Sequence, residues 1–243
     1  MTSDRLYSNG RIAEDFTFND SVAEVFDDML DRSIPFYQTV IELTAALIRQ
    51  LAAPGSRVYD LGCSTGTTLL VLSRLLADMD LHFTGIDNAP AMIAKARRKV
   101  EMYGKSAVIE FRTADITQVE LPGADIIVCN YTMQFIRPPR RQEFIRRLHE
   151  SLEKGGMLII SEKVISPNAR LNRKYIDLYY DFKRKQGYSE LEIAAKREAL
   201  ENILIPFSVQ ENKDLLTDAG FDEVESFFQW INFASFLALK VNR

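Results

Sequence analysis

The stretch that decides the fold is Arg57-Val58-Tyr59-Asp60-Leu61-Gly62-Cys63-Ser64-Thr65-Gly66-Thr67-Thr68-Leu69-Leu70. Val58 to Leu61 predicts a short buried strand, and the apolar residues of Thr68 to Leu76 predict a buried crossover helix. Gly62 and Gly66 bracket the turn between them, and because they lack a Cβ, the backbone can approach a ligand closely there. The free N–H groups at the start of the helix would then face an anionic or polar group.

The glycine spacing of this loop argues against a dinucleotide site. The three glycines of the G-x-G-x-x-G fingerprint would fall on Gly62, Ser64 and Thr67, so only the first is present. The spacing Asp60-x-Gly62-x-Ser64-x-Gly66 instead resembles motif I of Rossmann-fold S-adenosylmethionine (SAM) methyltransferases, many of which have glycine where Ser64 stands. In that superfamily the loop holds the methionine part of the cofactor.

Composition limits the class of protein. With 243 residues, of which 47% are hydrophobic, the chain can bury one substantial core, so we expect a single domain over 1–243. A net charge of -4 argues against direct binding of nucleic acid. The first residues have no apolar signal-peptide core, and no apolar run approaches the length of about 18 residues that a membrane span needs. We therefore expect a cytoplasmic protein that does not enter a membrane.

The reactive side chains are few. Cys63 and Cys129 are the two cysteines, and His82 and His149 are the two histidines. None of them lies in a metal-ligand or triad motif, so the sequence predicts no metal site and no histidine-based nucleophilic catalysis.

Strand and helix patterns alternate along the middle of the chain, which predicts a parallel sheet with right-handed crossovers. The end of the chain predicts an antiparallel hairpin on the sheet edge. We expect an α/β, Rossmann-like SAM methyltransferase fold with a seven-stranded, mostly parallel sheet. The predicted strands are Val58–Leu61, Leu81–Ile86, Val108–Arg112, Asp125–Cys129, Gly156–Ser161, Glu223–Trp230 and Phe233–Val241.

The rest of the chain divides around this core. Residues 1–53 hold two helices, which either pack on the sheet edge or form a lid over the cofactor, and the sequence leaves both open. Residues 54–162 form the Rossmann-like core. Residues 163–207 are a helical insertion after strand five, in which Leu171, Tyr175, Leu178, Tyr179 and Phe182 stripe one helix face. Residues 208–243 form the last helix and the hairpin.

Polar side chains follow four of the predicted strands, at the glycine loop, Asp87, Asp115 and Asn130. Ligands of such sheets bind beyond the carboxyl ends of the strands. Asp87 can accept hydrogen bonds from both ribose hydroxyls, and Asp115 can accept one from an adenine amino group while Ile116 packs on the ring. Because these side chains would lie together at one sheet edge, the sequence predicts binding of an adenosyl group.

Two further segments argue against methylation of nucleic acid bases and against phosphate binding. Asn130-Tyr131-Thr132-Met133 lacks the Asn/Asp-Pro-Pro-aromatic run of nucleic-acid amine methyltransferases and the Pro-Cys nucleophile of cytosine C5 enzymes. The basic run from Arg137 to Arg147 is interleaved with Glu143 and Glu150, which favours a solvated helix face over phosphate contacts.

The insertion carries an unusual cation. Ser189-x-x-Glu192 predicts a capping box, and Ile193, Leu200 and Leu204 form an apolar stripe on the helix that follows. Arg197 falls inside this stripe, where a guanidinium needs an anionic partner. Either an internal Asp or Glu pairs with it, or the side chain extends to solvent at the rim, or it clamps the carboxylate of a ligand bidentately.

These features together resemble one family, the carboxy-S-adenosyl-L-methionine synthases. The resemblance runs through the whole chain and is most selective in the Asn130 run and in the Arg197 helix. It implies a homodimer that converts SAM and prephenate into carboxy-SAM and phenylpyruvate, with the product passed to an enzyme that makes the oxyacetyl group of tRNA wobble uridine. The matching segments are Phe16–Asp20, Tyr59–Thr68, Gly85–Asn88, Asn130–Phe135, Gly187–Ile193 with Lys196-Arg197, and Trp230–Lys240.

The resemblance also implies roles for single residues. Arg197 would bind the new carboxylate and so serve as the catalytic residue. The family's cofactor contacts fall on Tyr37, Gly62, Cys63, Ser64, Asp87, Asn88, Asp115, Ile116 and Asn130. The resemblance further suggests that hydroxide lost from prephenate removes the methyl proton.

Three other functions stay open from the residues alone. The first is an ordinary SAM-dependent methyltransferase of a small carboxylic acid, with Arg197 binding that acid. The second is a SAM-binding interaction protein without catalysis. The third, a nicotinamide oxidoreductase, is the weakest because the third glycine is missing.

Overall fold

The computed structural model describes residues 4–8 and 17–241. A twisted sheet runs through the molecule with the strand order β3-β2-β1-β4-β5-β8-β7, and a short strand, β6, pairs with the end of β5. The strands are β1 (Arg57–Leu61), β2 (His82–Asp87), β3 (Ile109–Thr113), β4 (Ala124–Asn130), β5 (Leu152–Ile165), β6 (Phe207–Ser208), β7 (Glu223–Trp230) and β8 (Phe233–Leu239).

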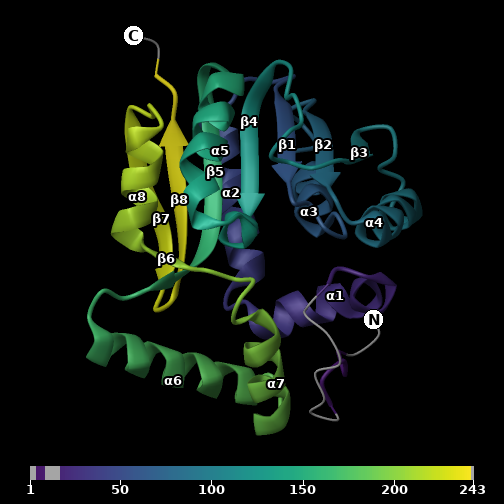
Figure 1. Ribbon diagram of the computed structural model, residues 1–243. Helices are drawn as coiled ribbons and strands as arrows, with labels where there is room; N and C mark the ends of the chain where they lie inside the picture. Colours follow the sequence, from purple (N-terminus) through teal and green to yellow (C-terminus); the bar gives the residue numbers. More distant parts are fainter. Residues whose placement is uncertain (1–3, 9–16, 242–243) are drawn as a thin grey trace.

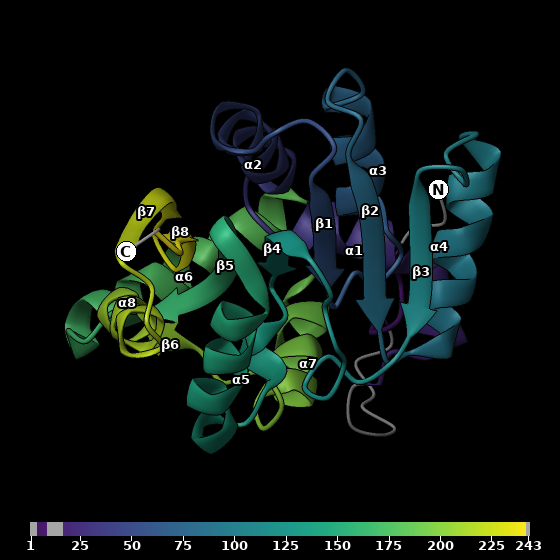
Figure 2. The ribbon, with the colours of Figure 1, turned by 90° about the horizontal axis from the view of Figure 1, so that it is seen from above.

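Helices cover both faces of this sheet, which makes a three-layer α/β fold (Figures 1 and 2). One face packs on α2, α3 and α4 through side chains such as Ile48, Leu72 and Ile93, and the other on α5 and α8 through Phe144 and Leu216. The helices are α1 (Asp20–Ser33), α2 (Tyr37–Leu51), α3 (Thr67–Leu75), α4 (Pro90–Met102), η1 (Met133–Phe135), α5 (Pro138–Ser151), α6 (Ala169–Lys185), α7 (Glu190–Leu200) and α8 (Val209–Asp218).

Strands β1 to β5 are parallel, while β8 runs antiparallel to β5 and β7 antiparallel to β8. The predicted α/β fold with a C-terminal hairpin is thereby confirmed. The two-residue strand β6, which pairs Phe207 and Ser208 with Val164 and Ile165, was not predicted because two residues carry no periodicity.

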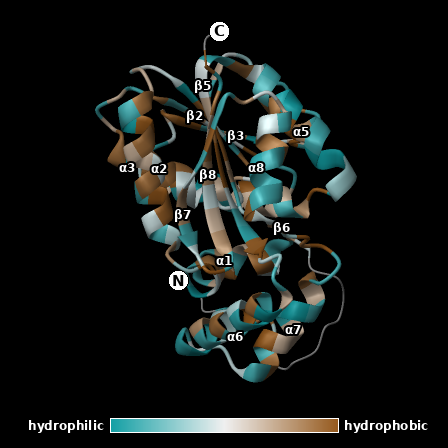
Figure 3. Ribbon diagram, turned by 90° about the vertical axis from the view of Figure 1, so that its left-hand side faces the viewer, coloured by the Kyte–Doolittle hydropathy of each residue, from teal (hydrophilic) through white to brown (hydrophobic). Residues whose placement is uncertain are grey.

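Three helices lie beyond the carboxyl ends of the parallel strands rather than on a face of the sheet. Figure 1 shows α1, α6 and α7 below the strand tips, and Figure 3 shows α6 and α7 standing apart from the layers around the sheet. In α6 the predicted apolar stripe is mostly not buried, because Leu171 and Leu178 are exposed and Tyr179 alone of that stripe is buried.

Strand β5 extends beyond the predicted Gly156–Ser161 at both ends. Leu152 pairs with Ala124, and the strand continues through Glu162 and Lys163, which pair with β8. Glu162 can stay buried in a strand because its carboxylate accepts the backbone N–H groups of Met133 and Gln134 at 2.9 and 3.0 Å. A charged residue at this point therefore does not end the strand.

The predicted solvated face of the basic run is confirmed at Arg140 and Arg146, which are exposed, but it is wrong at Arg141. Arg141 is 1% exposed. Its guanidinium donates to the carbonyl oxygens of Ile136, Gln134 and Ile205 at 2.8, 3.1 and 2.6 Å. Arg141 thus holds the segment after α7 against η1, a role that depends on residues distant in sequence.

Candidate active site

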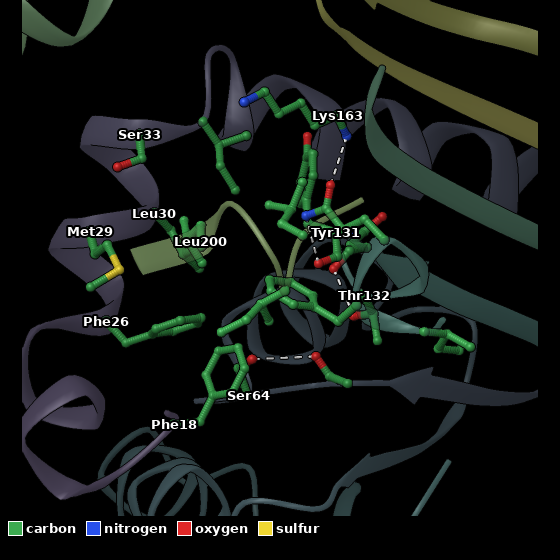
Figure 4. A pocket seen from close by; sticks show the side chains of 18 of the residues that line it. Phe18, Phe26, Met29, Leu30, Ser33, Ser64, Tyr131, Thr132, Lys163 and Leu200 are labelled. Carbon is green, nitrogen blue, oxygen red and sulfur yellow. Dashed lines mark hydrogen bonds between the residues drawn. The ribbon is translucent and has the colours of Figure 1, made fainter. Parts of the chain in front are cut away.

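A pocket of about 620 Å³ lies between the carboxyl ends of the parallel strands and helices α1, α6 and α7. This volume suits a ligand of nucleoside size or larger. Figure 4 shows Tyr131 and Thr132 on one side of the space, Phe26, Met29 and Leu30 of α1 on the other, and Ser64 below, between the two sides. The pocket lining includes every site residue predicted from the sequence: Tyr37, Gly62, Cys63, Ser64, Asp87, Asn88, Asp115, Ile116, Asn130 and Arg197.

The glycine loop after β1 is tightly fitted. Gly62 has φ +75°, and a Cβ there would stand 2.3 Å from Thr132 Oγ1. Gly66 has φ +72°, and its Cβ would stand 2.8 Å from the ring of Phe111. Both positions need glycine, because a side chain would be strained in this region of φ and would collide with its neighbour.

Ser64 occupies the place of the middle glycine and keeps the conformation that glycine favours, with φ +48°. Its backbone N–H donates to Asp87 Oδ2 at 2.9 Å, and Asp87 Oδ1 accepts the N–H of Ala89 at 2.9 Å. Burial raises the pKa of Asp87. Asp87 therefore ties the loop to the end of β2, and its oxygens retain lone pairs that face the pocket.

Asn130, at the end of β4, has a buried side-chain amide whose nitrogen and oxygen find no hydrogen-bond partner among residues 4–8 and 17–241. A buried amide without partners costs free energy unless a ligand supplies them. Because Asn130 lines the pocket, the donors and acceptors of a bound nucleoside would satisfy it, and so the residues here fit SAM.

Asp60 lines the pocket as well, although its place in the sequence motif predicts no role for it. It is 2% exposed, and no described residue donates a hydrogen bond to its carboxylate. Burial, together with the charge of Asp87, raises its pKa to about 8. A buried carboxyl at the ligand's edge is suited to receive a cationic group, and the amino group of SAM is one.

The predicted adenine contacts lie at the open end of the pocket. Asp115 is exposed, and its Oδ1 accepts hydrogen bonds from the backbone N–H and the hydroxyl of Thr117 at 2.9 and 2.8 Å. Ile116 is half-buried, and Asn88 is exposed. The Asp115 carboxylate retains acceptor capacity beyond its own turn.

Aromatic side chains line the inner end of the pocket. The Tyr37 hydroxyl lies 3.5 Å from Thr68 Oγ1, and the rings of Tyr37 and Tyr131 are 6.2 Å apart. Tyr131 has φ +56°, a strained value for a bulky residue, at the point where β4 leaves the sheet. Burial raises the pKa of both phenols, so both are neutral at ordinary pH.

The prediction that Arg197 lies inside an apolar stripe with Leu204 is wrong in two respects. Helix α7 ends at Leu200, so Leu204 is not on it, and Arg197 is exposed rather than inside an apolar stripe. The buried cation is the adjacent Lys196, which lies on the face of Ile193 and Ala199. Arg197 still lines the pocket of its own chain, and no described residue pairs with its guanidinium.

Two features are absent from residues 4–8 and 17–241. No group of three or more His, Cys, Asp or Glu side chains is placed to hold a metal ion. No described helix combines the length and apolar composition needed to cross a membrane.

Comparison with known proteins places this geometry in a family. Residues 58–156 match the family model described as a methyltransferase domain. The carboxy-S-adenosyl-L-methionine synthase of Desulfotalea psychrophila is 54% identical over 98% of this chain and 97% of its own length. The protein of the same name from Campylobacter concisus is 47% identical, over 94% of this chain and 96% of its own.

Solved structures share the fold at low identity. Human N-acetylserotonin methyltransferase in complex with SAM gives a TM-score of 0.64 at 15% identity, covering 99% of this chain and 63% of that one. Magnesium protoporphyrin IX methyltransferase from Synechocystis with bound SAH gives 0.58 at 18% identity, covering 84% and 82%. The predicted cofactor, SAM, is confirmed, and this chain belongs to the carboxy-S-adenosyl-L-methionine synthase family.

Proposed function

We propose that this protein converts SAM and prephenate into carboxy-SAM and phenylpyruvate. The observation that carries the proposal is Arg197, a cation without an ion-pair partner among the described residues, at the same pocket as Asn130 and the glycine loop. A methyltransferase needs a nucleophile behind the sulfonium methyl. A carboxylating enzyme needs instead a cation beside that methyl, where a negative charge appears.

The proposed contacts to SAM follow the lining of the pocket. The glycine loop from Gly62 to Ser64 holds the methionine part, and Asp87 with Asn88 receives the ribose hydroxyls. Asp115 and Ile116 receive the adenine, while Tyr37 and Asn130 close the inner end. Asp60 adds an acceptor for the amino group. The bordering side chains of α1, Phe26 and Met29 among them, support its role as a lid that excludes water.

The proposed reaction balances without a protein base. Prephenate loses carbon dioxide and hydroxide as its ring becomes aromatic, and the hydroxide takes a proton from the sulfonium methyl and becomes water. The resulting carbanion attacks carbon dioxide to form the carbon–carbon bond of carboxy-SAM. Burial raises the pKa of Cys63 well above its usual value, so that thiol stays protonated and takes no part as a base. The protein supplies positioning and charge pairing.

We further propose that two copies associate in the cytoplasm and that carboxy-SAM passes to an enzyme of tRNA wobble-uridine modification. Support for association comes from apolar side chains left open on neighbouring elements. Leu171 and Leu178 on α6 are 45% and 47% exposed, and Phe36 before α2 is 53% exposed. A second copy would cover such a surface.

Mass spectrometry of the nucleotide that is released from the purified protein tests the function. After incubation with SAM and prephenate, we expect a SAM derivative heavier by one carbon dioxide, together with phenylpyruvate. Transfer of methyl to a supplied small acid would instead support an ordinary methyltransferase, whose acid substrate the same cationic pocket could bind. Bound SAM with no turnover of either kind would support a SAM-binding protein without catalysis.

A further inference from the structure

Three lysines from three different elements line the inner part of the pocket, and the reaction as proposed assigns them no role. Lys163 comes from β5, Lys183 from α6 and Lys196 from α7. Lys183 and Lys196 are 6% and 5% exposed, and Lys163 is half-buried. In Figure 4 the Lys163 side chain extends from β5 across the pocket. We call these three residues the lysine cluster.

The charges of the cluster are not balanced by the described residues. Lys196 Nζ donates to Ser33 Oγ at 3.0 Å and lies 3.5 Å from Asp4 Oδ2. Lys183 and Lys163 have neither an ion pair nor a side-chain hydrogen bond within residues 4–8 and 17–241. Their ammonium groups both lie 5.1 Å from the centre of the Tyr179 ring. Among the described residues, Asp4 is therefore the one carboxylate that forms an ion pair with the cluster, and it does so with Lys196 alone.

This arrangement is costly for the protein alone. A buried ammonium loses its hydration, and contact with an aromatic ring replaces only part of it. Burial accordingly lowers the pKa values of the two most buried lysines. Burial, helped by the charges of Lys196 and Lys163, lowers the pKa of Lys183 to about 7, and burial lowers that of Lys196 to about 8 although Asp4 opposes it. A purely structural core position would be filled better by an apolar residue.

We propose that the lysine cluster binds a carboxylate of the acid substrate, a proposal that rests on the proposed function. Prephenate carries two carboxylates, and only one of them is transferred. Arg197 faces the pocket from the exposed side of α7, whereas the cluster lies inside, so the two cationic points can hold the two ends of one dianion. The cluster holds the pyruvyl carboxylate that phenylpyruvate retains, and it selects dicarboxylates over monocarboxylates.

Binding of prephenate to protein saturated with S-adenosylhomocysteine tests this proposal without turnover, because that nucleotide has no methyl to transfer. The variants are Lys183→Met, Lys163→Met and the control Lys174→Met. Lys174 lies on the same helix as Lys183, but its side chain is 70% exposed. Titration calorimetry should give a Kd for prephenate that is about 10- to 100-fold weaker for Lys183→Met and unchanged for Lys174→Met.

Two further readouts separate binding from folding. Affinity for S-adenosylhomocysteine should not change in any variant, and Lys183→Met should melt no lower than the wild type because an unpaired buried charge is removed. If Lys183→Met does not fold, the half-buried Lys163→Met carries the same test. Unchanged binding of prephenate by the folded variants overturns the proposal.

The outcome also distinguishes this proposal from the proposed function. If prephenate binding depends on the lysines but no carboxy-SAM forms, the proposed role of the lysine cluster stands and the proposed reaction is wrong. Formation of carboxy-SAM with an unchanged KM for prephenate in Lys183→Met would sustain the reaction and reject the cluster.

Discussion

The carboxylate of Asp27 on α1 accepts a hydrogen bond from the hydroxyl of Thr65 in the glycine loop, with 2.6 Å between the two oxygens. The same oxygen accepts from Thr67 Oγ1 at 2.8 Å, and Lys99 Nζ on α4 lies 2.7 Å from the other oxygen. A helix beyond the sheet is thus fixed to the loop that follows β1. This contact fixes the position of α1, which forms one wall of the pocket, relative to the glycine loop, which forms another.

Asp27→Ala should therefore weaken binding of SAM and lower stability. Lys99 would lose its ion-pair partner and both threonine hydroxyls would lose their acceptor, at a cost of about 2 kcal/mol, although Lys99 Nζ still donates to Thr67 Oγ1 at 2.7 Å. Calorimetry and thermal unfolding check both effects, with the exposed Asp31→Ala on the same helix as the control. Equal melting temperatures and equal affinities for the two variants would show that the contact does not position α1.

The pKa of Asp27 gives the pH dependence of this contact. Burial alone would raise the pKa, but Lys99 and the two hydroxyls outweigh it and hold the pKa below its usual value. A lowered pKa in the folded state means that the contact stabilises the protein at neutral pH and that this contribution is lost as the pH falls through the folded-state pKa. The difference in unfolding free energy between wild type and Asp27→Ala should shrink correspondingly in acid.

Asn130→Leu should weaken SAM binding by roughly tenfold or more. The polar atoms of SAM that pair with the Asn130 amide would instead face an apolar side chain and lose their hydrogen bonds. Stability should hold, since the amide lacks described partners in the free protein. Asn232 provides the matched control, because its amide is also buried without a described partner but does not line the pocket. Asn232→Leu should bind SAM as the wild type does, and a similar loss in both variants would contradict the role of Asn130.

SAM affinity should rise between about pH 6 and about pH 7.5 if Asp60 receives the cationic amino group. The pKa of Asp60 is about 8 in the free protein, so the carboxyl is mostly protonated below that pH. A bound cation favours the ionised form of the Asp60 carboxyl, so this carboxyl must lose its proton when SAM binds. The free energy needed to remove that proton falls as the pH rises. The rise should disappear in Asp60→Asn, and a pH profile unchanged by that substitution would assign it to another group, such as Asp87.

Arg197→Ala should lower the rate of carboxy-SAM formation about a hundredfold, which corresponds to about 3 kcal/mol of transition-state stabilisation. Affinity for SAM should change little, because the new carboxylate does not exist in the substrate. Arg173→Ala, an exposed change on α6, is the control. Full activity in Arg197→Ala would refute the charge-pairing role.

Much of the fold could be predicted because its signals are local. The alternation of strand and helix patterns predicted the sheet and its hairpin, and the Ser189 capping box predicted the start of α7 where the structure has it. The strand ends were harder, since the burial of Glu162 depends on backbone N–H groups from η1.

The pocket could be predicted only in part. The glycine loop, Asp87 and Asn130 follow successive strands, so the topology alone brings them to one edge. The lysine cluster was missed because its partners are remote. Lys196 meets Asp4 from the other end of the chain, and Lys183 lies opposite Lys163 of β5. Helical spacing around Ile193 could not decide whether Lys196 or Arg197 is buried, since the two are adjacent on the helix.

The most direct measurement follows a heavy-carbon label placed in the ring carboxylate of prephenate. The purified protein is incubated with this prephenate, unlabelled SAM and unlabelled bicarbonate, and carboxy-SAM is isolated and weighed by mass spectrometry. We expect the new carboxyl carbon to carry the label and phenylpyruvate to carry none. Unlabelled carboxy-SAM, or a methylated acid in its place, would contradict it.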